Sequence, residues 1–146
     1  MAIISNRKAY FEYFINDEFS AGIILQGSEV KSIRRGHVSF ADSFCHIVNG
    51  EVFLKNLNIA ENKFSGKYTN HEPTRPRKLL LHKSEISKIQ KALTQKGLTL
   101  VPLKIWITST GFIKIDIGIA KGKKLFDKRA TIKARDNSRD IKKYVS

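Results

Sequence analysis

The sequence predicts a mainly β protein, namely a small closed β-barrel with two or three flanking helices and a basic C-terminal tail. Three observations favour this fold class. Six or seven short apolar runs are bounded by turn residues, whereas only two segments carry a helical pattern. The length of 146 residues suits a single domain with its own core. The last 27 residues are basic and contain few bulky apolar side chains.

In the N-terminal half, four apolar runs predict strands: residues 9–15, 21–26, 43–48 and 51–57. The last two runs flank Asn49-Gly50, and Asn-Gly between apolar runs is the strongest short hairpin signal. Residues 28–35 predict a short helix, which Ser28 is expected to cap and Gly36 to end.

In the C-terminal half, three apolar runs predict strands: residues 78–81, 98–108 and 112–119. The polar segment 61–78 predicts a long loop, and residues 84–96 predict an amphipathic helix that ends at Gly97. In the last strand, isoleucines alternate with Lys114 and Asp116, so these two side chains should face water. One small barrel of this kind is the OB-fold, which often binds nucleic acid.

The charge of the chain indicates a polyanionic partner. The formal net charge is +14, and the segment from Ala120 to Ser146 holds ten Lys or Arg against three Asp. We therefore expect an RNA-binding barrel over residues 1–120 and a basic tail over 121–146, disordered when free and helical when bound. A membrane partner is disfavoured, because the chain has neither a transmembrane-length apolar run nor an aromatic-rich basic amphipathic helix.

The residues that usually carry catalysis or metal binding are not grouped in this sequence. The four histidines lack zinc-ligand spacing with Cys45, the single cysteine, and the 13 acidic residues are scattered. There is no phosphate loop and no nucleophile elbow. We expect no catalytic site, no metal and no cofactor. The first residues, MAIISNRK, contain too short an apolar run for a signal peptide, so we expect a cytoplasmic protein.

Cationic residues concentrate in three segments: Asn6-Arg7-Lys8; Arg75, Arg77 and Lys78; and Lys121, Lys123, Lys124, Lys128 and Arg129. Lysine and arginine side chains release counterions when they bind phosphates, which gives strong, salt-dependent affinity. For the first two clusters, a solvated strand end explains the charges equally well. Tyr10, Phe11 and Phe126 offer rings for base stacking. Gly122 lets the backbone either leave the barrel sharply or approach RNA closely.

Seven ordered segments, spread over most of the length, carry a family resemblance: Asn6-Arg7-Lys8-Ala9, AGIILQGSEVKSIRRG (21–36), ADSF (41–44), NGEVFL (49–54), PTRPRKLLLHKSEI (73–86), KGLTLVPLKIW (96–106) and IGIAKGKKLFDKR (117–129). With these segments the chain closely resembles the small protein B family, the transfer-messenger RNA-binding proteins of bacterial trans-translation. The resemblance implies an OB-fold barrel that binds the tRNA-like domain of that RNA. The complex would enter the empty A site of a stalled ribosome, with elongation factor Tu involved indirectly through the charged RNA. The tail would fold into a helix along the vacant messenger channel.

The resemblance and the basic clusters together give a candidate RNA-binding set: Asn6, Arg7, Lys8, Ser20, Glu29, Lys31, Arg75, Arg77, Lys78, Leu80, Lys114, Lys121, Gly122, Lys123 and Lys124. The resemblance also implies a set in the tail that contacts the decoding centre and messenger channel: Phe126, Asp127, Lys128, Arg129, Lys133 and Arg135. Phe126 would offer its ring to a decoding base.

The chain departs from the family pattern at several of these positions. Relatives often have Glu where this chain has Ser20 and His where it has Phe11, so polar contacts in the RNA-facing region differ here. Phe126 replaces the usual Tyr or His, and TIKARD (131–136) replaces the frequent DIKERE. Two other functions remain open from the residues alone. One is a general RNA-binding barrel, and the other is an RNA-processing enzyme, which would need a carboxylate cluster. A basic tail on a complete barrel favours the rescue factor over both.

Overall fold

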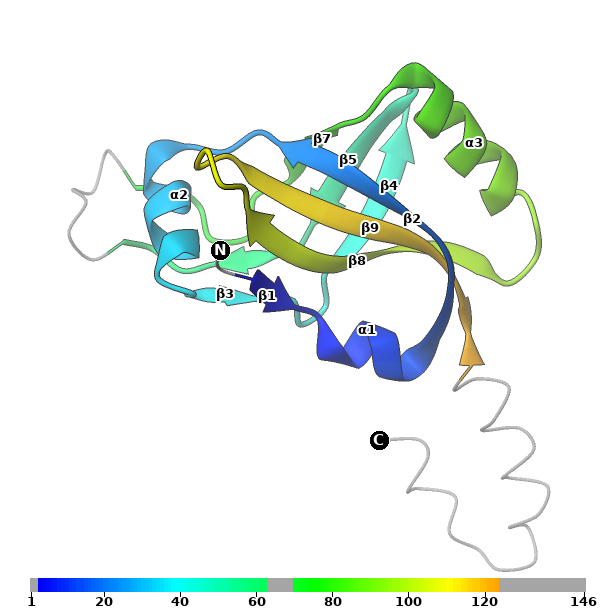
Figure 1. Cartoon of the computed structure of the whole chain (residues 1–146), viewed down its shortest axis with the longest axis horizontal. Coiled ribbons are helices and arrows are strands. Elements are labelled where there is room, and N and C mark those ends of the chain that lie inside the picture. Colours follow the sequence, from blue (N-terminus) through cyan, green and yellow to red (C-terminus); the bar gives the residue numbers. More distant parts are fainter. Residues whose placement is uncertain (1–2, 63–69, 124–146) are drawn as a thin grey trace, which may run out of the picture.

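The structure is a computed structural model that describes residues 3–62 and 70–123, and within them it is mainly β with a few helices (Figure 1). The strands are β1 (Ile3–Ser5), β2 (Tyr13–Ile23), β3 (Val38–Ser39), β4 (Phe44–Val48), β5 (Glu51–Lys55), β6 (Asn58–Ile59), β7 (Arg77–Leu80), β8 (Leu98–Ile107) and β9 (Ile113–Gly122). The helices are α1 (Arg7–Glu12), α2 (Gly27–Arg34) and α3 (Lys83–Leu93).

Seven strands form one antiparallel sheet in the order β1-β8-β9-β2-β7-β5-β4, and β3 pairs with β6 separately. Strand β2 pairs with β9 along most of its length but with β7 only at Gly22 and Ile23. The sheet therefore turns at this junction, and β8, β9 and β2 cross in front of β7, β5 and β4 (Figure 1). Among the described residues the sheet has two free edges, β1 and β4, so the predicted closed barrel is not found.

The main core lies between the two halves of the sheet. The alternating isoleucines of β9 point into it, as the sequence predicts, and each helix of the pair α2 and α3 adds one fully buried isoleucine, Ile33 and Ile89. The other members with the lowest exposure come from β2, β5, β6, β7 and β8 and from the residue before β6: Ala21, Val52, Leu54, Leu57, Ile59, Leu79, Leu100 and Ile105.

Helix α1 covers part of the opposite face of the sheet. Its buried Ala9 packs with Val101, Leu103 and Ala120 in a second apolar cluster. Lys104 and Asp116 lie beyond the helix on the same face, so this part of the sheet stays open to a partner. The outer face of β8, β9 and β2 is thus half covered and half exposed.

The predicted strand at residues 9–15 is wrong over its first half. Residues 9–12 belong to α1, and the strand begins at Tyr13. The aromatic run suggested a strand, but packing of Ala9 on the sheet decides the local structure. Residues 13–15 of this prediction and residues 21–23 of the predicted strand 21–26 belong to one 11-residue strand, β2. The register between β2 and β9 shifts between Ile15 and Asp17.

The hairpin prediction is confirmed. Strands β4 and β5 pair in register, and Asn49 (φ 52°) and Gly50 (φ 73°) both have the positive φ that a type I′ turn requires. Helix α2 begins one residue earlier than predicted, and its capping box joins Gln26 and Glu29, so Ser28 is not the cap. Strands β1, β3 and β6 were not predicted because two or three residues are too short to show alternation.

Candidate nucleic-acid interface

Three predicted RNA-binding residues that lie far apart in the sequence come together at the turn of the sheet. Gly22 on β2 lies opposite both Leu80 on β7 and Lys114 on β9. Ser20 and Leu80 line, with Lys114, a hollow of about 280 Å³ that the start of α3 closes through Leu81, His82 and Glu85. The side chain of Leu80 is 52% exposed, which is unusual for a leucine on a central strand. The structure thus joins a hydroxyl, an apolar surface and a cation.

Next to this hollow, Asp116 holds three side chains from the neighbouring strands. Its Oδ1 accepts hydrogen bonds from Ser20 Oγ and from Trp106 Nε1, both at 2.8 Å. Lys104 Nζ lies 3.8 Å from its Oδ2. Burial, followed by the nearby Glu18 and Asp116 carboxylates, raises the pKa of Tyr10. Helix α1 therefore borders the same polar patch.

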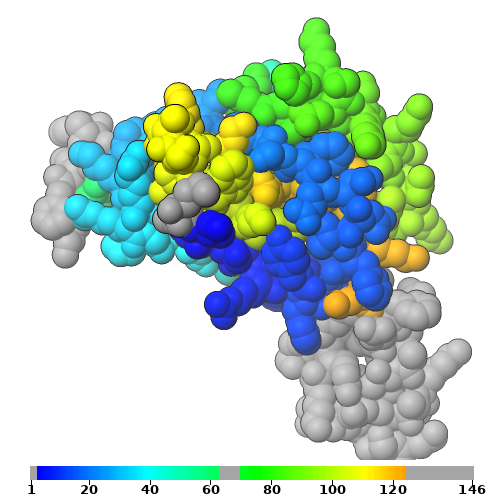
Figure 2. Space-filling model, viewed as in Figure 1, coloured from blue at the N-terminus to red at the C-terminus, as the bar shows by residue number. Residues whose placement is uncertain are grey.

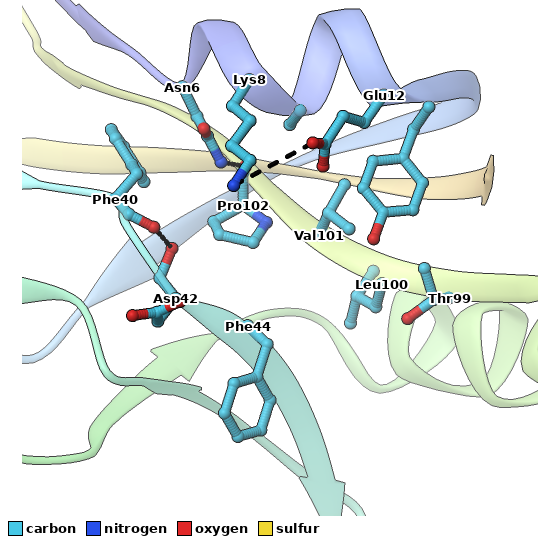
Figure 3. Close-up of a pocket in the computed structure, with 13 residues that line it drawn as sticks. Asn6, Lys8, Glu12, Phe40, Asp42, Phe44, Thr99, Leu100, Val101 and Pro102 are labelled. Atoms are coloured by element: carbon cyan, nitrogen blue, oxygen red, sulfur yellow. Dashed lines mark hydrogen bonds and ion pairs between the residues drawn. The ribbon is translucent and has the colours of Figure 1, made fainter. Parts of the chain in front are cut away.

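The N-terminal cluster divides into one structural residue and two exposed cations. The Asn6 side chain donates a 2.8 Å hydrogen bond to the Pro102 carbonyl, and its backbone amide donates to Leu103 (Figure 3). Asn6 thereby fixes the start of α1 on β8. Arg7 and Lys8 are exposed on the helix, and Lys8 Nζ lies 4.0 Å from Glu12. Asn6 and Lys8 line a second hollow of about 190 Å³ between α1, β8 and the segment around Asp42 (Figure 3).

The end of β9 presents the third basic cluster beside an aromatic ring. Lys121 lies opposite Phe14 in the β2–β9 ladder, and Gly122 lies opposite Tyr13. Lys123 Nζ is 5.1 Å from the centroid of the Phe14 ring, which is 56% exposed. Figure 2 shows this orange end of β9 at the edge of the molecule, beside the blue N-terminal segment. Strand β9 continues through residues that the sequence assigned to the tail.

The glycine at position 122 gives a test of close approach by RNA. Gly122 has no positive φ, and an added Cβ would meet only Tyr13 Cε1 at 3.9 Å, an ordinary contact. We expect Gly122→Ala to leave the melting temperature unchanged and, if the sequence-based assignment of this glycine to the RNA-binding set is right, to weaken RNA binding, because the new methyl group would block a close approach of RNA to the backbone. Thermal melts and binding titrations check this. Unchanged RNA affinity would assign this glycine no close contact.

The two arginines of the second basic cluster are paired with an acidic residue inside the protein. The side chains of Glu29 and Arg77 are 0% exposed, and that of Arg75 is 25% exposed. Glu29 accepts hydrogen bonds from Arg75 at 2.6 and 2.9 Å and from Arg77 at 2.7 Å. Arg77 also donates to the backbone carbonyls of Leu57 and Pro73. This buried network ties α2 to the segment before β7, so Glu29 and Arg77 have a structural role.

The network also changes the ionisation of its members. Burial alone would raise the pKa of Glu29, but hydrogen bonds from Arg75, the Gln26 amide and Arg77 lower it below its ordinary value. Burial lowers the pKa of Arg77, and Glu29 opposes that effect. Glu29 is therefore held as a carboxylate between two guanidinium groups.

The other predicted residues are dispersed. Lys78 on β7 pairs with Glu51 at 2.6 Å, and both side chains are exposed. Lys31 is exposed near the end of α2. Several members of the predicted sets lie outside the described residues: Lys124, Phe126, Asp127, Lys128, Arg129, Lys133 and Arg135.

Four residues of this surface were absent from the predicted sets: Phe14, Lys104, Trp106 and Asp116. The alternation in β9 does place Asp116 on the same face as Lys114, and that signal is visible in the sequence. Lys104 and Trp106 also lie on one face of β8. That this is the same face as Asp116 follows only once the register between β8 and β9 is known. Phe14 was predicted only as part of the strand 9–15, whereas the structure leaves it 56% exposed beside Lys123.

Within the described ranges, no group of three His, Cys, Asp or Glu is placed to hold a metal ion. Cys45 on β4 packs against the core, and burial raises the pKa of its thiol, so it stays protonated. None of the helices described is long and apolar enough to cross a membrane.

Lysines beside exposed leucine and aromatic side chains on a mainly β fold define a nucleic-acid-binding class of protein. The model of the SmpB protein family matches residues 3–146, and this chain belongs to that family. The resemblance stated from the sequence is thereby confirmed.

Individual relatives agree with the family match. The SsrA-binding protein of Thermosipho melanesiensis is 48% identical over 98% of this chain and 97% of its own length. The SsrA-binding protein of Caldicellulosiruptor saccharolyticus is 52% identical over 98% of this chain and 89% of its own length. A chain of the solved structure "tmRNA-SmpB: a journey to the center of the bacterial ribosome" is 47% identical, with a TM-score of 0.70 over 83% of this chain and 84% of that chain.

Proposed function

We propose that this protein binds the tRNA-like domain of transfer-messenger RNA and delivers that RNA to the A site of stalled bacterial ribosomes. The observation that carries the proposal is the match, at 47% identity, to a chain of the solved structure "tmRNA-SmpB: a journey to the center of the bacterial ribosome". The names of the relatives, SsrA-binding proteins, support the same RNA partner. The partners are therefore transfer-messenger RNA and the ribosome, with elongation factor Tu meeting the protein only through the charged RNA. The site of action is the cytoplasm, and the activity is binding rather than catalysis.

We assign RNA binding first to the residues that the fold brings together around the hollow at the turn of the sheet, Ser20, Leu80 and Lys114. Arg7 and Lys8 on α1, and Lys121 to Lys123 at the end of β9, supply further cations. Lysines bind phosphates, while Phe14 offers a flat ring and Leu80 an aliphatic contact to unpaired bases. Arg75 and Arg77 act indirectly in this scheme, by holding α2 and the segment before β7 in place.

We propose two functional regions, an RNA-binding sheet and a C-terminal segment that contacts the decoding centre and messenger channel. The boundary is better set after Gly122, where β9 ends, than at residue 120. We also propose that the sheet is an open relative of the OB-fold barrel. Its support is that residues of β4 approach β8 within 8 Å, Cα to Cα, although the two strands are not hydrogen-bonded partners.

The test is competitive binding. Purified protein is titrated with the tRNA-like domain, with an ordinary transfer RNA and a random RNA hairpin as competitors, at two salt concentrations. We expect the tRNA-like domain to keep its advantage at the higher salt, because shape-specific contacts persist when phosphate contacts weaken. If all three RNAs bind alike and dissociate together as salt rises, only the net charge of +14 acts, and the protein is a general RNA binder.

A further inference from the structure

The polar patch beside the hollow has a fixed hydrogen-bond polarity. Ser20 Oγ donates its single proton to Asp116 Oδ1 at 2.8 Å, and Trp106 Nε1 donates its proton to the same oxygen at 2.8 Å. An ionised carboxylate can only accept, so the direction of both bonds is fixed. With its proton directed into the sheet, the exposed Ser20 hydroxyl presents only lone pairs to an incoming partner.

The position of Lys114 restricts which RNA group can use that acceptor. Lys114 lies two residues before Asp116 on β9 and so projects from the same face, about 7 Å further along the strand. Ser20 lies opposite Asp116 in the β2–β9 ladder, so its acceptor and the Lys114 cation share one face of the sheet. A ribose with its 3′-phosphate offers the complementary pair, a hydroxyl donor next to an anion. DNA has the phosphate but not the donor, because it lacks the 2′-hydroxyl.

We propose that Ser20 accepts a hydrogen bond from a ribose 2′-hydroxyl of the bound RNA, and that Asp116 is the positioning residue that gives Ser20 this polarity. Asp116 does not need to touch the RNA, since its side chain is 16% exposed and already has three partners. The proposal rests on the proposed function, and it adds the chemical group that this part of the surface recognises.

The experiment is a scan of the tRNA-like domain with single 2′-deoxy substitutions, each titrated against four proteins: wild type, Ser20→Ala, Asp116→Ala and Glu18→Ala. With wild type, deoxy substitution at one or two positions should weaken binding roughly twofold to tenfold, the value of one net hydrogen bond. With Ser20→Ala the same substitution should cost nothing, and with Asp116→Ala it should cost less than in wild type, because the freed hydroxyl can then donate as well as accept.

Glu18→Ala is the matched control. Glu18 lies on the same strand as Ser20 and is exposed, and its removal changes the net charge by the same amount as removal of Asp116. Both variants lose one negative charge from a surface that faces phosphate, which favours the binding of all RNAs by the same amount. Only Asp116→Ala should reduce the preference for ribose over deoxyribose at the identified position.

Two further measurements keep the result interpretable. The emission of Trp106, the single tryptophan, reports on the Asp116 network, and thermal melts report on folding. If Asp116→Ala does not fold, Asp116→Asn replaces it, since its amide can donate to Ser20 and free the hydroxyl proton. The proposal is overturned if no deoxy position depends on Ser20, or if the Asp116 variants keep the full wild-type preference. Failure of wild type to prefer the tRNA-like domain over other RNAs would instead count against the proposed function.

Discussion

Replacing Glu29 with glutamine is expected to lower the free energy of unfolding by about 3–5 kcal/mol, the cost of removing one partner from a buried ion pair. The side chains of Glu29 and Arg77 are 0% exposed, so the substitution leaves a buried guanidinium without a counterion. The melting temperature should fall by roughly 10–20 °C. Chemical denaturation of wild type and Glu29→Gln, followed by far-ultraviolet circular dichroism, measures the difference.

Glu51→Gln is the matched control for this prediction. Glu51 also pairs with a cation at 2.6 Å, but its side chain and that of Lys78 are 47% and 39% exposed. Water screens such a pair, so this substitution should cost less than about 1 kcal/mol. Equal losses in the two variants would contradict the structural role given to the buried network.

The same network predicts a pH dependence of stability. Because the pKa of Glu29 is lower in the folded state than its ordinary value of 4.5, its contribution is fully present above that pH. The contribution is lost as the pH falls through the lower, folded-state pKa. The difference in stability between wild type and Glu29→Gln should therefore shrink below about pH 4.5. A constant difference down to lower pH would show that Glu29 does not ionise in this way.

Deleting residues 130–146 is expected to abolish ribosome rescue and to spare binding of the tRNA-like domain. Strand β9 ends at Gly122 and, among the residues that the structure describes, both core clusters are built from residues between Ile4 and Ala120, so we expect the RNA-binding sheet to fold without the deleted segment. The deleted segment holds five Lys or Arg and two Asp, so its loss should also reduce the salt dependence of RNA binding slightly.

Two assays separate the functions. One is the affinity for the tRNA-like domain, which should stay within about threefold of wild type, and the other is tagging of a stalled nascent chain in reconstituted translation. Lys114→Glu is the reciprocal control, since it should weaken RNA binding while leaving the C-terminal segment intact. A large loss of RNA affinity in the truncated protein would contradict the division into two binding surfaces.

The sequence predicts those parts of the fold whose signals are local. Asn49-Gly50 and its flanking apolar runs are adjacent in the chain, and the hairpin follows from them. The strand prediction failed at residues 9–12. Their aromatic pattern indicates a strand, whereas contacts with β8, almost a hundred residues away, hold this segment as a helix. The prediction of a closed barrel failed for a related reason, because the alternation of apolar and polar residues does not determine whether the edge strands pair.

The candidate site shows the same division. The resemblance identified Ser20, Leu80 and Lys114, but their meeting depends on the register of three strands, which alternation cannot supply. Arg75 and Arg77 were counted as free cations because their acidic partner, Glu29, lies 46 and 48 residues away. A charge total treats every arginine as available, and only the fold shows which ones are already used.

The position of β9 has a mechanical consequence. This strand pairs with β2 on one side and β8 on the other over most of its ten residues, and the C-terminal segment continues directly from its end. A force that pulls on that segment acts along the strand and loads both ladders in shear. The hydrogen bonds lie across the pulling direction, so they must break together instead of one after another. The segment is therefore tethered to the interior of the sheet, where tension from a moving ribosome would meet high resistance.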